Sequence, residues 1–411
     1  MSQAQATYRE TFAVSEFRAL WVAQIFSIVG DYLARIALSV LVFHRTGSTF
    51  LTATIFAVSF LPPVIGGPIL AGLADRYPRR TVMVLCDLLR AALVALMVIS
   101  HVPILVLAAL LFVTELLASP FSAARSATLP DVLPGDLYVM GSAVSNITNE
   151  LGQVFGLGVG GTVVAVLGTH GALGVDAATF LLSAVVLRLG VRKRGIDQDE
   201  ESGRVSLLAG TMAGTRLVFG QPRLRALVCL AWLCAFYVVP EGLAVPYAAS
   251  LGGGAATAGL LLAANPAGTV LGAVVVSRLF TPPRRLQLMG PLAVLSCVPL
   301  LGFVAKPGLV WATVLLAVSG IGSAYNLPAN AAFVAAVPSH QRGQAFGLVA
   351  SGMSVFQGVA LLAGGALAQF SQPSLVIAGA GAAGVVVALL LAAAPLRPGR
   401  LAVSGAPVPA G

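Results

Sequence analysis

The sequence predicts an all-α membrane protein whose twelve transmembrane helices form two pseudo-symmetric bundles of six helices each. Three observations predict this fold: an apolar composition, hydrophobic segments of spanning length, and motifs that recur at a nearly constant spacing. Of the 411 residues, 58% are hydrophobic and 9% are charged, and the mean hydropathy is +0.94. Because a soluble domain has about 25% charged residues, most of the surface of this protein has to face lipid.

Hydrophobic segments in lipid have to be helices, because lipid offers free backbone groups no hydrogen-bond partner. A helix that crosses the bilayer needs roughly 20 residues. We expect spans at residues 17–43, 50–74, 80–100, 102–124, 138–168, 171–189, 224–249, 255–279, 286–304, 308–335, 343–370 and 374–395. The polar segment Met1–Arg18 lacks the pattern of a cleavable signal peptide, so we expect the first span to be retained.

Basic residues are distributed unequally between alternate loops. Outer loops carry only Arg45 and Lys306, whereas the loops on the side of the termini carry most of the arginines, as at residues 76–80, 188–194 and 278–285. This asymmetry follows the positive-inside rule and predicts a multi-pass protein of the inner (plasma) membrane with both termini in the cytoplasm. Topology therefore explains the net charge of +9, which does not indicate nucleic-acid binding.

The two halves of the chain resemble each other in sequence. The recurring pairs are Phe17–Trp21 with Leu224–Val228, Pro78–Arg80 with Pro283–Arg285, Val132–Pro134 with Ala336–Pro338, and Gly160–Gly161 with Gly364–Gly365. Their offsets lie between 204 and 207 residues and their order is the same, which indicates an internal duplication. Because each repeat has an even number of spans, both halves keep one orientation in the membrane, as in transporters that rock two bundles about a central site.

The polar stretch Arg192–Arg204 separates the two halves. We expect an N-terminal bundle at residues 1–190 and a cytoplasmic linker with an amphipathic helix at residues 191–223. A C-terminal bundle at residues 224–396 and a cytoplasmic tail at residues 397–411 complete the predicted organisation.

The loop between the second and third spans reads Gly72-Leu73-Ala74-Asp75-Arg76-Tyr77-Pro78-Arg79-Arg80. It resembles the signature loop of the major facilitator superfamily, and together with the duplicated halves this resemblance covers nearly the whole chain. The resemblance implies a conformational latch: Gly72 permits close packing, and Asp75 accepts hydrogen bonds from the start of the eleventh helix near Gln341–Gly343. Alternatively, Asp75 caps its own loop. We expect Arg76, Arg79 and Arg80 to anchor the loop at lipid headgroups.

Other elements indicate a branch of this superfamily. Asp87 and Arg90 in the third span, Ala124-Arg125 in the fourth and Asn326-Leu327-Pro328 in the tenth resemble the drug and siderophore exporters, which include macrolide-efflux and enterobactin-exporter-like proteins. We assign Asp87, Arg90 and Arg125 to the network of the latch.

The fifth span is rich in glycine, at Gly152, Gly156, Gly160 and Gly161. It is similar to the glycine-rich element of antiporters in this superfamily. Small residues let helices approach closely, so ordinary helix packing is the alternative explanation.

Ionisable residues inside spans are costly and face a cavity or one another. The candidates for proton coupling are Asp31, Arg35, Glu115, Glu150 and Glu241. Asp31 and Arg35 lie one turn apart on one face of the first span. A change in hydration as the cavity opens to either side would move a proton on or off Asp31. Alternatively, Asp31 and Arg35 form a permanently ionised pair that only orients helices.

Aromatic and amide side chains are expected to contact an amphipathic solute. The candidates for a substrate cavity are Phe26, Tyr32, Phe236, Tyr237, Tyr325 and Asn326. For each aromatic residue, core packing or a place at the membrane interface is the alternative. The four histidines lie in predicted loops and the four cysteines in predicted spans as small apolar side chains, so we expect neither a metal nor a cofactor.

The favoured function is proton-coupled efflux, by alternating access, of a hydrophobic or amphipathic small molecule such as an antibiotic, a siderophore or a related metabolite. The expected partners are this substrate, protons and membrane lipids, and we expect a monomer. The alternatives are an importer or a lipid-handling transporter of the same superfamily and, less favoured, a membrane-embedded enzyme. We expect no enzymatic activity, because the sequence shows no catalytic cluster and no phosphate-binding loop.

Overall fold

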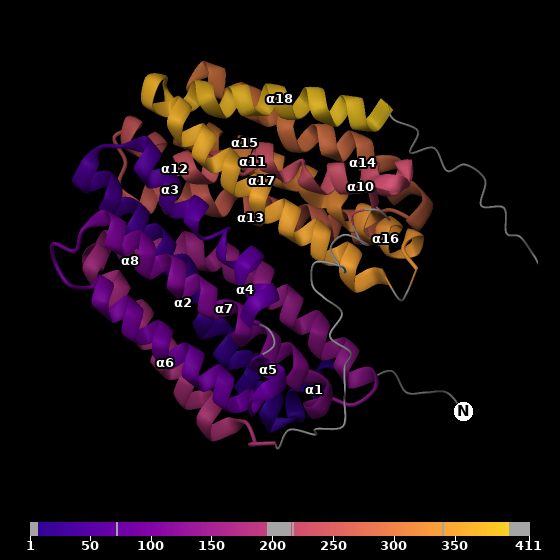
Figure 1. Cartoon of the computed structure of the whole chain (residues 1–411). Helices are drawn as coiled ribbons and strands as arrows, with labels where there is room; N and C mark the ends of the chain where they lie inside the picture. Colours follow the sequence, from indigo (N-terminus) through magenta and orange to yellow (C-terminus); the bar gives the residue numbers. More distant parts are fainter. Residues whose placement is uncertain (1–6, 71–72, 195–214, 216–217, 339–340, 394–411) are drawn as a thin grey trace, which may run out of the picture.

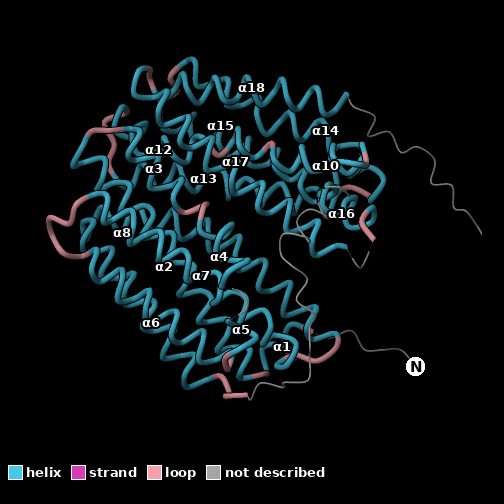
Figure 2. Tube along the Cα trace, viewed as in Figure 1, coloured by secondary structure: helices cyan, strands magenta, loops and turns pink. Residues whose placement is uncertain are grey.

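The computed structural model describes residues 7–70, 73–194, 215, 218–338 and 341–393, and these residues contain helices and no strand. Figure 2 shows long helices joined by short loops. The first half of the chain forms α1 (Tyr8–Ala13), α2 (Ser15–Thr46), α3 (Thr49–Val58), α4 (Pro62–Leu70), α5 (Leu73–Arg76), α6 (Arg79–Met97), α7 (Ile104–Val132) and α8 (Asp136–Gly190).

The second half repeats this helical arrangement. It forms α10 (Pro222–Trp232), α11 (Cys234–Tyr237), α12 (Val239–Ser250), α13 (Ala255–Leu279), α14 (Pro282–Cys297), the 3-10 helix η1 (Val298–Ala305), α15 (Leu309–Gly322), the 3-10 helix η2 (Ser323–Tyr325), α16 (Asn326–Ala336), α17 (Arg342–Phe370) and α18 (Pro373–Ala393). The amphipathic helix predicted in the linker includes residues 205–214 and 216–217, which lie outside the described residues, so most of it is not described.

Each of the twelve predicted spans overlaps one or more helices of the described residues. Within the described residues, nine helical segments are long and apolar enough to cross a membrane. One of them, α8, contains two predicted spans, which meet at Gly168, where φ is 71° and ψ is 172°. The span predicted at residues 50–74 includes α3, α4 and α5: α3 and α4 are separated by residues 59–61, and residues 71–72 between α4 and α5 lie outside the described residues. The helix α6 carries four charged residues. Neither region is among the nine. The number of crossings stays a prediction.

The helices form two groups that follow the two halves of the sequence. Figure 1 shows the indigo-to-magenta helices in one group and the orange-to-yellow helices in the other. Between the groups, α8 contacts α13, and α3 contacts α12 and α17. We call the end at which α2 begins and α18 ends the proximal end, and the opposite end the distal end. In Figure 1 the two groups are close together at the distal end and diverge toward the proximal end.

The buried apolar residues show the same division. One large cluster joins both halves through distal residues such as Val42, Phe56 and Leu261. At the proximal end two separate clusters occur: one belongs to the first half and includes Phe17, and the other belongs to the second half and includes Phe333. The two halves therefore share one core distally and have a core each proximally.

Two glycine contacts hold the distal ends together. A Cβ atom on Gly161 of α8 would lie 2.6 Å from the Cα atom of Gly259 in α13, and a Cβ atom on Gly365 of α17 would lie 2.5 Å from the Cβ atom of Ala53 in α3. Gly161 corresponds to Gly365 at an offset of 204 residues, and Ala53 corresponds to Gly259 at an offset of 206. The contact thus occurs twice, as expected from a duplicated chain.

Candidate functional site

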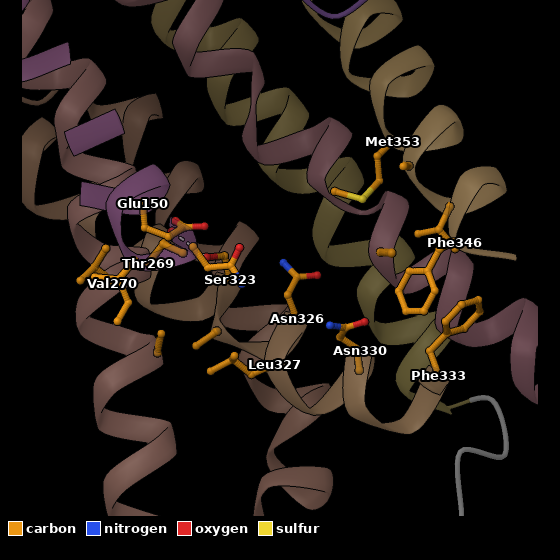
Figure 3. Close-up of a pocket in the computed structure, with 18 of the residues that line it drawn as sticks. Glu150, Thr269, Val270, Ser323, Asn326, Leu327, Asn330, Phe333, Phe346 and Met353 are labelled. Atoms are coloured by element: carbon orange, nitrogen blue, oxygen red, sulfur yellow. Dashed lines mark hydrogen bonds between the residues drawn. The ribbon is translucent and has the colours of Figure 1, made fainter. Parts of the chain in front are cut away.

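A cavity of about 820 Å³ lies at the proximal end, between α8 of the first half and several helices of the second half. Its described lining comes from the proximal parts of α8, α10, α13, η2, α16 and α17. Much of the wall is apolar, with the side chains of Leu227, Phe333, Phe346 and Met353 among its residues. Figure 3 shows Phe333 of α16 beside Phe346 of α17, and Met353 further along α17.

Polar groups interrupt the apolar wall at a few places. They are Asn146, Glu150, Thr269, Ser323, Asn326 and Asn330. In Figure 3, Glu150 lies beside Thr269 and Ser323. The hydroxyl groups of Thr269 and Ser323 are hydrogen-bonded at 2.8 Å. Among the described lining residues, Glu150 is the only side chain that carries a charge.

A second polar site lies buried inside the first half, around Arg90 of α6. The Arg90 side chain is 0% exposed. It forms an ion pair with Asp31 of α2, donates a hydrogen bond of 2.9 Å to Ser27, and lies 3.7 Å from Asp87. Its guanidinium group also stacks on the ring of Phe180, 4.2 Å from the ring centroid. Such a buried charge needs partners of this kind, because removing one partner costs about 3–5 kcal/mol.

The neighbouring buried pair is Arg35 of α2 with Glu115 of α7. Their nitrogen and oxygen atoms lie 2.9 Å apart, and the side chains are 19% and 7% exposed. Arg35 also lies 5.2 Å from the ring centroid of Tyr32. Glu241 of α12 approaches from the second half, close enough to interact electrostatically with Arg35. The cation of this pair therefore lies near the interface of the two halves.

These pairings correct the alternative in which Asp31 and Arg35 form an ion pair with each other. Asp31 and Arg35 share a helix face but do not pair with each other, because each finds a partner on another helix: Asp31 pairs with Arg90, and Arg35 pairs with Glu115. Arg90, which we assign to the network of the latch, lies in the buried cluster with Asp31, and its role in the latch stays a prediction. Asp87 lies in the same cluster, where Ser183 of α8 donates a hydrogen bond to it.

Sequence reasoning missed Asp176 in the second part of α8. This carboxyl group is 0% exposed, and neither of its oxygen atoms has a hydrogen-bond partner among the described residues. Asp31 of α2, Arg90 of α6 and Glu115 of α7 are near enough to act on it electrostatically. The sequence contains a signal that could have identified it, because Asp176 is an acidic residue inside a predicted span.

Arg125 of α7 has only neutral hydrogen-bond partners among the described residues. It donates to the side-chain oxygen of Gln24 at 2.7 Å and to the hydroxyl of Ser145 at 3.3 Å. Gln24 in turn donates to Asn149 at 3.1 Å. This network joins α2, α7 and α8 beside the part of α8 that lines the cavity, so the predicted assignment of Arg125 to the latch is not tested by these contacts.

The loop predicted to form the latch is described only in part. Gly72 lies outside the described residues, as does the side chain of Asp75. Arg76 is exposed. Arg79 pairs with Asp131 at the end of α7 at 2.7 Å, and Arg80 donates a hydrogen bond to the backbone of Arg188. The contact of Asp75 with the start of α17 therefore stays a prediction.

The glycines of the fifth span lie against other helices. A Cβ atom on Gly152 would lie 2.5 Å from the side chain of Ile28, and one on Gly156 would lie 2.9 Å from that of Tyr32. Gly160 approaches Leu33 and Ile36 of the same helix, α2, whereas Gly161 faces α13 of the other half. These positions permit close packing within the first half and, at one point, between the halves.

Of the six predicted substrate contacts, Asn326 lines the cavity. Tyr325 is 0% exposed, and its hydroxyl group donates to the backbone oxygen of Leu230 at 3.0 Å. Tyr237 accepts a hydrogen bond from Asn326 at 3.4 Å.

The other three aromatic candidates are not among the described lining residues of this cavity. Phe236 packs on Gly384 and Tyr32 packs on Gly156, while Phe26 is half-buried. The core-packing alternative therefore fits Tyr325 and Phe236 in this conformation.

Comparisons with known proteins agree with this architecture. The family model of the Major Facilitator Superfamily matches residues 20–245 and 242–410. The chain is 26% identical to the uncharacterized MFS-type transporter YfiS of Bacillus subtilis, over 90% of this chain and 91% of that protein. It is 27% identical to the multidrug efflux pump Tap of Mycolicibacterium fortuitum, over 78% of this chain and 81% of the pump.

Two further relatives match the predicted exporter branch. The enterobactin exporter EntS of Salmonella choleraesuis is 28% identical over 64% of each chain, and macrolide efflux protein A of Streptococcus pyogenes is 20% identical over 44% of this chain and 47% of its own length. Among solved structures, that of nucleoside transporter NupG superposes with a TM-score of 0.73 at 13% identity, over 92% of this chain and 98% of the other. That likeness shows the fold. The chain belongs to the Major Facilitator Superfamily and is a multi-pass membrane transporter of small molecules.

Proposed function

We propose that this protein is a proton-coupled exporter of hydrophobic or amphipathic small molecules that works by alternating access. In this proposal it lies in the inner membrane as a monomer surrounded by lipid, with both termini in the cytoplasm. The observation that carries the proposal is the cavity of about 820 Å³ between the two halves. Its size lies within the range of about 300–1,000 Å³ that holds drug-sized ligands.

The position of the cavity indicates which side is open. All its described lining residues belong to the proximal parts of their helices, and the basic loops favour a cytoplasmic position for that end. At the distal end the glycine contacts and the shared core join the two halves. This arrangement corresponds to an inward-facing state, in which an exporter takes up its substrate.

The chemistry of the wall favours one class of substrate. Amide and hydroxyl groups on an apolar surface suit a solute with a few polar groups on a large apolar body. Because Glu150 is the only charged side chain of the described lining, a neutral or cationic amphiphile fits better than a molecule with several negative charges. The similarity to multidrug and macrolide efflux proteins supports this class more than the similarity to a siderophore exporter does.

Buried acidic residues support coupling to protons. Asp31, Asp87, Glu115 and Asp176 lie inside the first half, next to two arginines. In a low-dielectric environment, burying an ionised carboxyl group costs more free energy than burying a protonated one. Movement of the surrounding helices changes this environment, and it therefore changes how strongly each group holds a proton.

The proposal is tested in an efflux-deficient bacterial host and in everted vesicles made from it. We expect resistance to a macrolide or to ethidium, and no secretion of a catecholate siderophore. In the vesicles, an imposed pH gradient (interior acidic) should drive uptake of the same compound. Accumulation of the compound inside intact cells would instead show an importer, and uptake that ignores the pH gradient would overturn proton coupling.

A further inference from the structure

Asp176 differs from Asp31 and Asp87 in the buried cluster because its carboxyl group forms no ion pair among the described residues. Its carboxyl group lies directly against α2: a Cβ atom on Gly30 would be 2.3 Å from its Oδ1 atom. The hydroxyl of Thr179, also beside Gly30, donates its hydrogen to the backbone oxygen of Asp176 at 2.8 Å. This hydroxyl also lies near enough to the carboxyl group to interact with it, but its hydrogen is directed to the backbone oxygen, so by bond geometry neither carboxyl oxygen has a hydrogen-bond partner among the described residues.

The charged groups around Asp176 come from three helices. Asp31 faces it from α2, Arg90 from α6 and Glu115 from α7. Arg90 stacks on Phe180, which lies one turn beyond Asp176 on the same face of α8. Arg90 is thus held close to Asp176, although its ion pair is made with Asp31.

The buried cluster contains more acidic side chains than basic ones. Glu115 is balanced by Arg35. The remaining cation, Arg90, is surrounded by Asp31, Asp87 and Asp176, so full ionisation would leave two uncompensated negative charges inside the bundle. Uncompensated charge is very costly there. Asp31 is stabilised by its ion pair, and Asp87 by Arg90 and by the hydroxyl of Ser183. Asp176 has no ion pair among the described residues, and the neighbouring hydroxyl of Thr179 donates its hydrogen to the backbone.

We propose that Asp176 holds a proton in this conformation and is the carboxyl group through which the transporter couples to protons. This inference rests on the proton-coupled function proposed above. With the proton on Asp176, Arg90 binds Asp31. When Asp176 loses its proton to water, it competes with Asp31 for the same guanidinium group.

Helix α2 connects the competing carboxylates with the cavity, because it carries Asp31 and packs on the helix that lines the cavity wall. Asp31 is followed by Tyr32, which packs on Gly156 of α8, and Ile28, one turn earlier, packs on Gly152. The segment of α8 just before these glycines lines the cavity with Asn146, Glu150 and Leu151. A shift of Asp31 away from Arg90 therefore moves the helix that supports the cavity wall.

A proton fits this site better than a metal cation does. The guanidinium group of Arg90 repels cations from the cluster, and no group of three or more potential ligands suited to a metal ion occurs among the described residues. Sodium coupling is nevertheless an outcome that the experiment distinguishes.

The test begins with infrared spectroscopy of the full-length protein in liposomes, which detects protonated carboxyl groups whatever the substrate is. We expect Asp176→Asn and Asp176→Ser to lose intensity in the protonated-carboxyl band at neutral pH. Asp31→Asn and the surface variant Asp131→Asn should keep that band. A spectrum of Asp176→Asn identical to that of the wild type would overturn the assignment.

The second readout is transport of ethidium in the same liposomes. For Asp176→Asn we expect uptake driven by a pH gradient to fall at least tenfold, while exchange of internal for external ethidium without a gradient persists. If gradient-driven uptake survives in Asp176→Asn but is lost in Asp31→Asn, the proposed role of Asp176 is wrong, whereas the proposed function stands. Wild-type protein that responds to a sodium gradient and ignores a pH gradient would instead overturn the proposed function.

Discussion

Gly161 of α8 and Gly259 of α13 face each other so closely that a Cβ atom on either would lie 2.6 to 2.7 Å from the Cα atom of the other. Since real Cβ contacts are not this short, any side chain at these positions forces the two backbones apart. The same relationship recurs between Gly365 and Ala53 in the other pair of helices. Closure of the distal end therefore depends on small residues at related positions in both halves.

Enlarging Gly161 should prevent distal closure. We expect Gly161→Leu to reduce transport at least tenfold while the protein still inserts and folds, because each half keeps its own proximal core. Accessibility would be measured in a cysteine-free background carrying Leu261→Cys, a buried distal position outside both glycine contacts, with a maleimide that does not cross the membrane. Labelling from outside should rise in the Gly161→Leu variant.

The matched control is Gly158→Ala, whose Cβ atom would lie at an ordinary 3.4 Å from Ala263 of the same facing helix. This variant should transport and label like the wild type. Equal labelling of Gly161→Leu and the wild type would show that the glycine contact does not control distal closure.

Glu150 should select for positive charge on the substrate. Glu150→Gln removes the only charge of the described cavity lining and keeps the shape of the side chain. We expect about tenfold weaker apparent affinity for ethidium, which corresponds to about 1.4 kcal/mol, and little change for a neutral amphiphile of similar size. Concentration-dependent transport measured in parallel for both compounds checks this, and equal losses for both would contradict it.

The pair of Arg35 and Glu115 should be strongly coupled in stability. Either Arg35→Gln or Glu115→Gln leaves one buried charge without its partner, which costs about 3–5 kcal/mol, so both single variants should unfold at lower temperature in detergent. The double variant should recover much of that loss because no unpaired charge remains. A double variant as unstable as the sum of the single ones would show that the two side chains act independently.

The exposed pair of Arg79 and Asp131 offers a comparison. Its side chains are 41% and 40% exposed, so solvent screens their interaction and Arg79→Gln should cost less than about 1 kcal/mol. The loss of stability in Arg35→Gln is then compared with the loss in Arg79→Gln, both measured by thermal unfolding under the same conditions. The difference between the two losses shows the effect of burial.

Much of the fold was predictable because lipid leaves the chain few choices. Segments such as 255–279 were identified to the residue, since a long apolar run in a membrane has to be a helix and Gly254 and Phe280 flank it. The region 50–74 was predicted as one helix, but the structure interrupts it between α3 and α4, because adjacent prolines at 62 and 63 lack the backbone N–H groups that would continue a helix.

The charged site was less predictable, for a physical reason. Spacing along one helix shows which residues share a face, and it correctly puts Asp31 and Arg35 on neighbouring turns of α2. Partners on other helices depend on rotations and depths that one sequence does not reveal, so the pairing of Asp31 with Arg90 could not be derived. Asp176 is different: an acidic residue within a span was visible, and only its unpartnered state required the structure.

Asn326 and Tyr325 are adjacent in sequence but should differ in their effects on transport and stability. Asn326 lines the cavity, so Asn326→Ala should raise the substrate concentration for half-maximal transport by about threefold to tenfold, the loss expected for about one hydrogen bond. Tyr325 is fully buried, and its hydroxyl group donates to Leu230 of α10. Tyr325→Phe removes that bond and leaves a buried carbonyl oxygen without this donor, so it should cost about 1–3 kcal/mol of stability and leave the half-maximal concentration unchanged. Transport kinetics and thermal unfolding of both variants separate the two roles. If Tyr325→Phe altered the kinetics and not the stability, the aromatic side chain would belong to the substrate site, as the sequence first suggested.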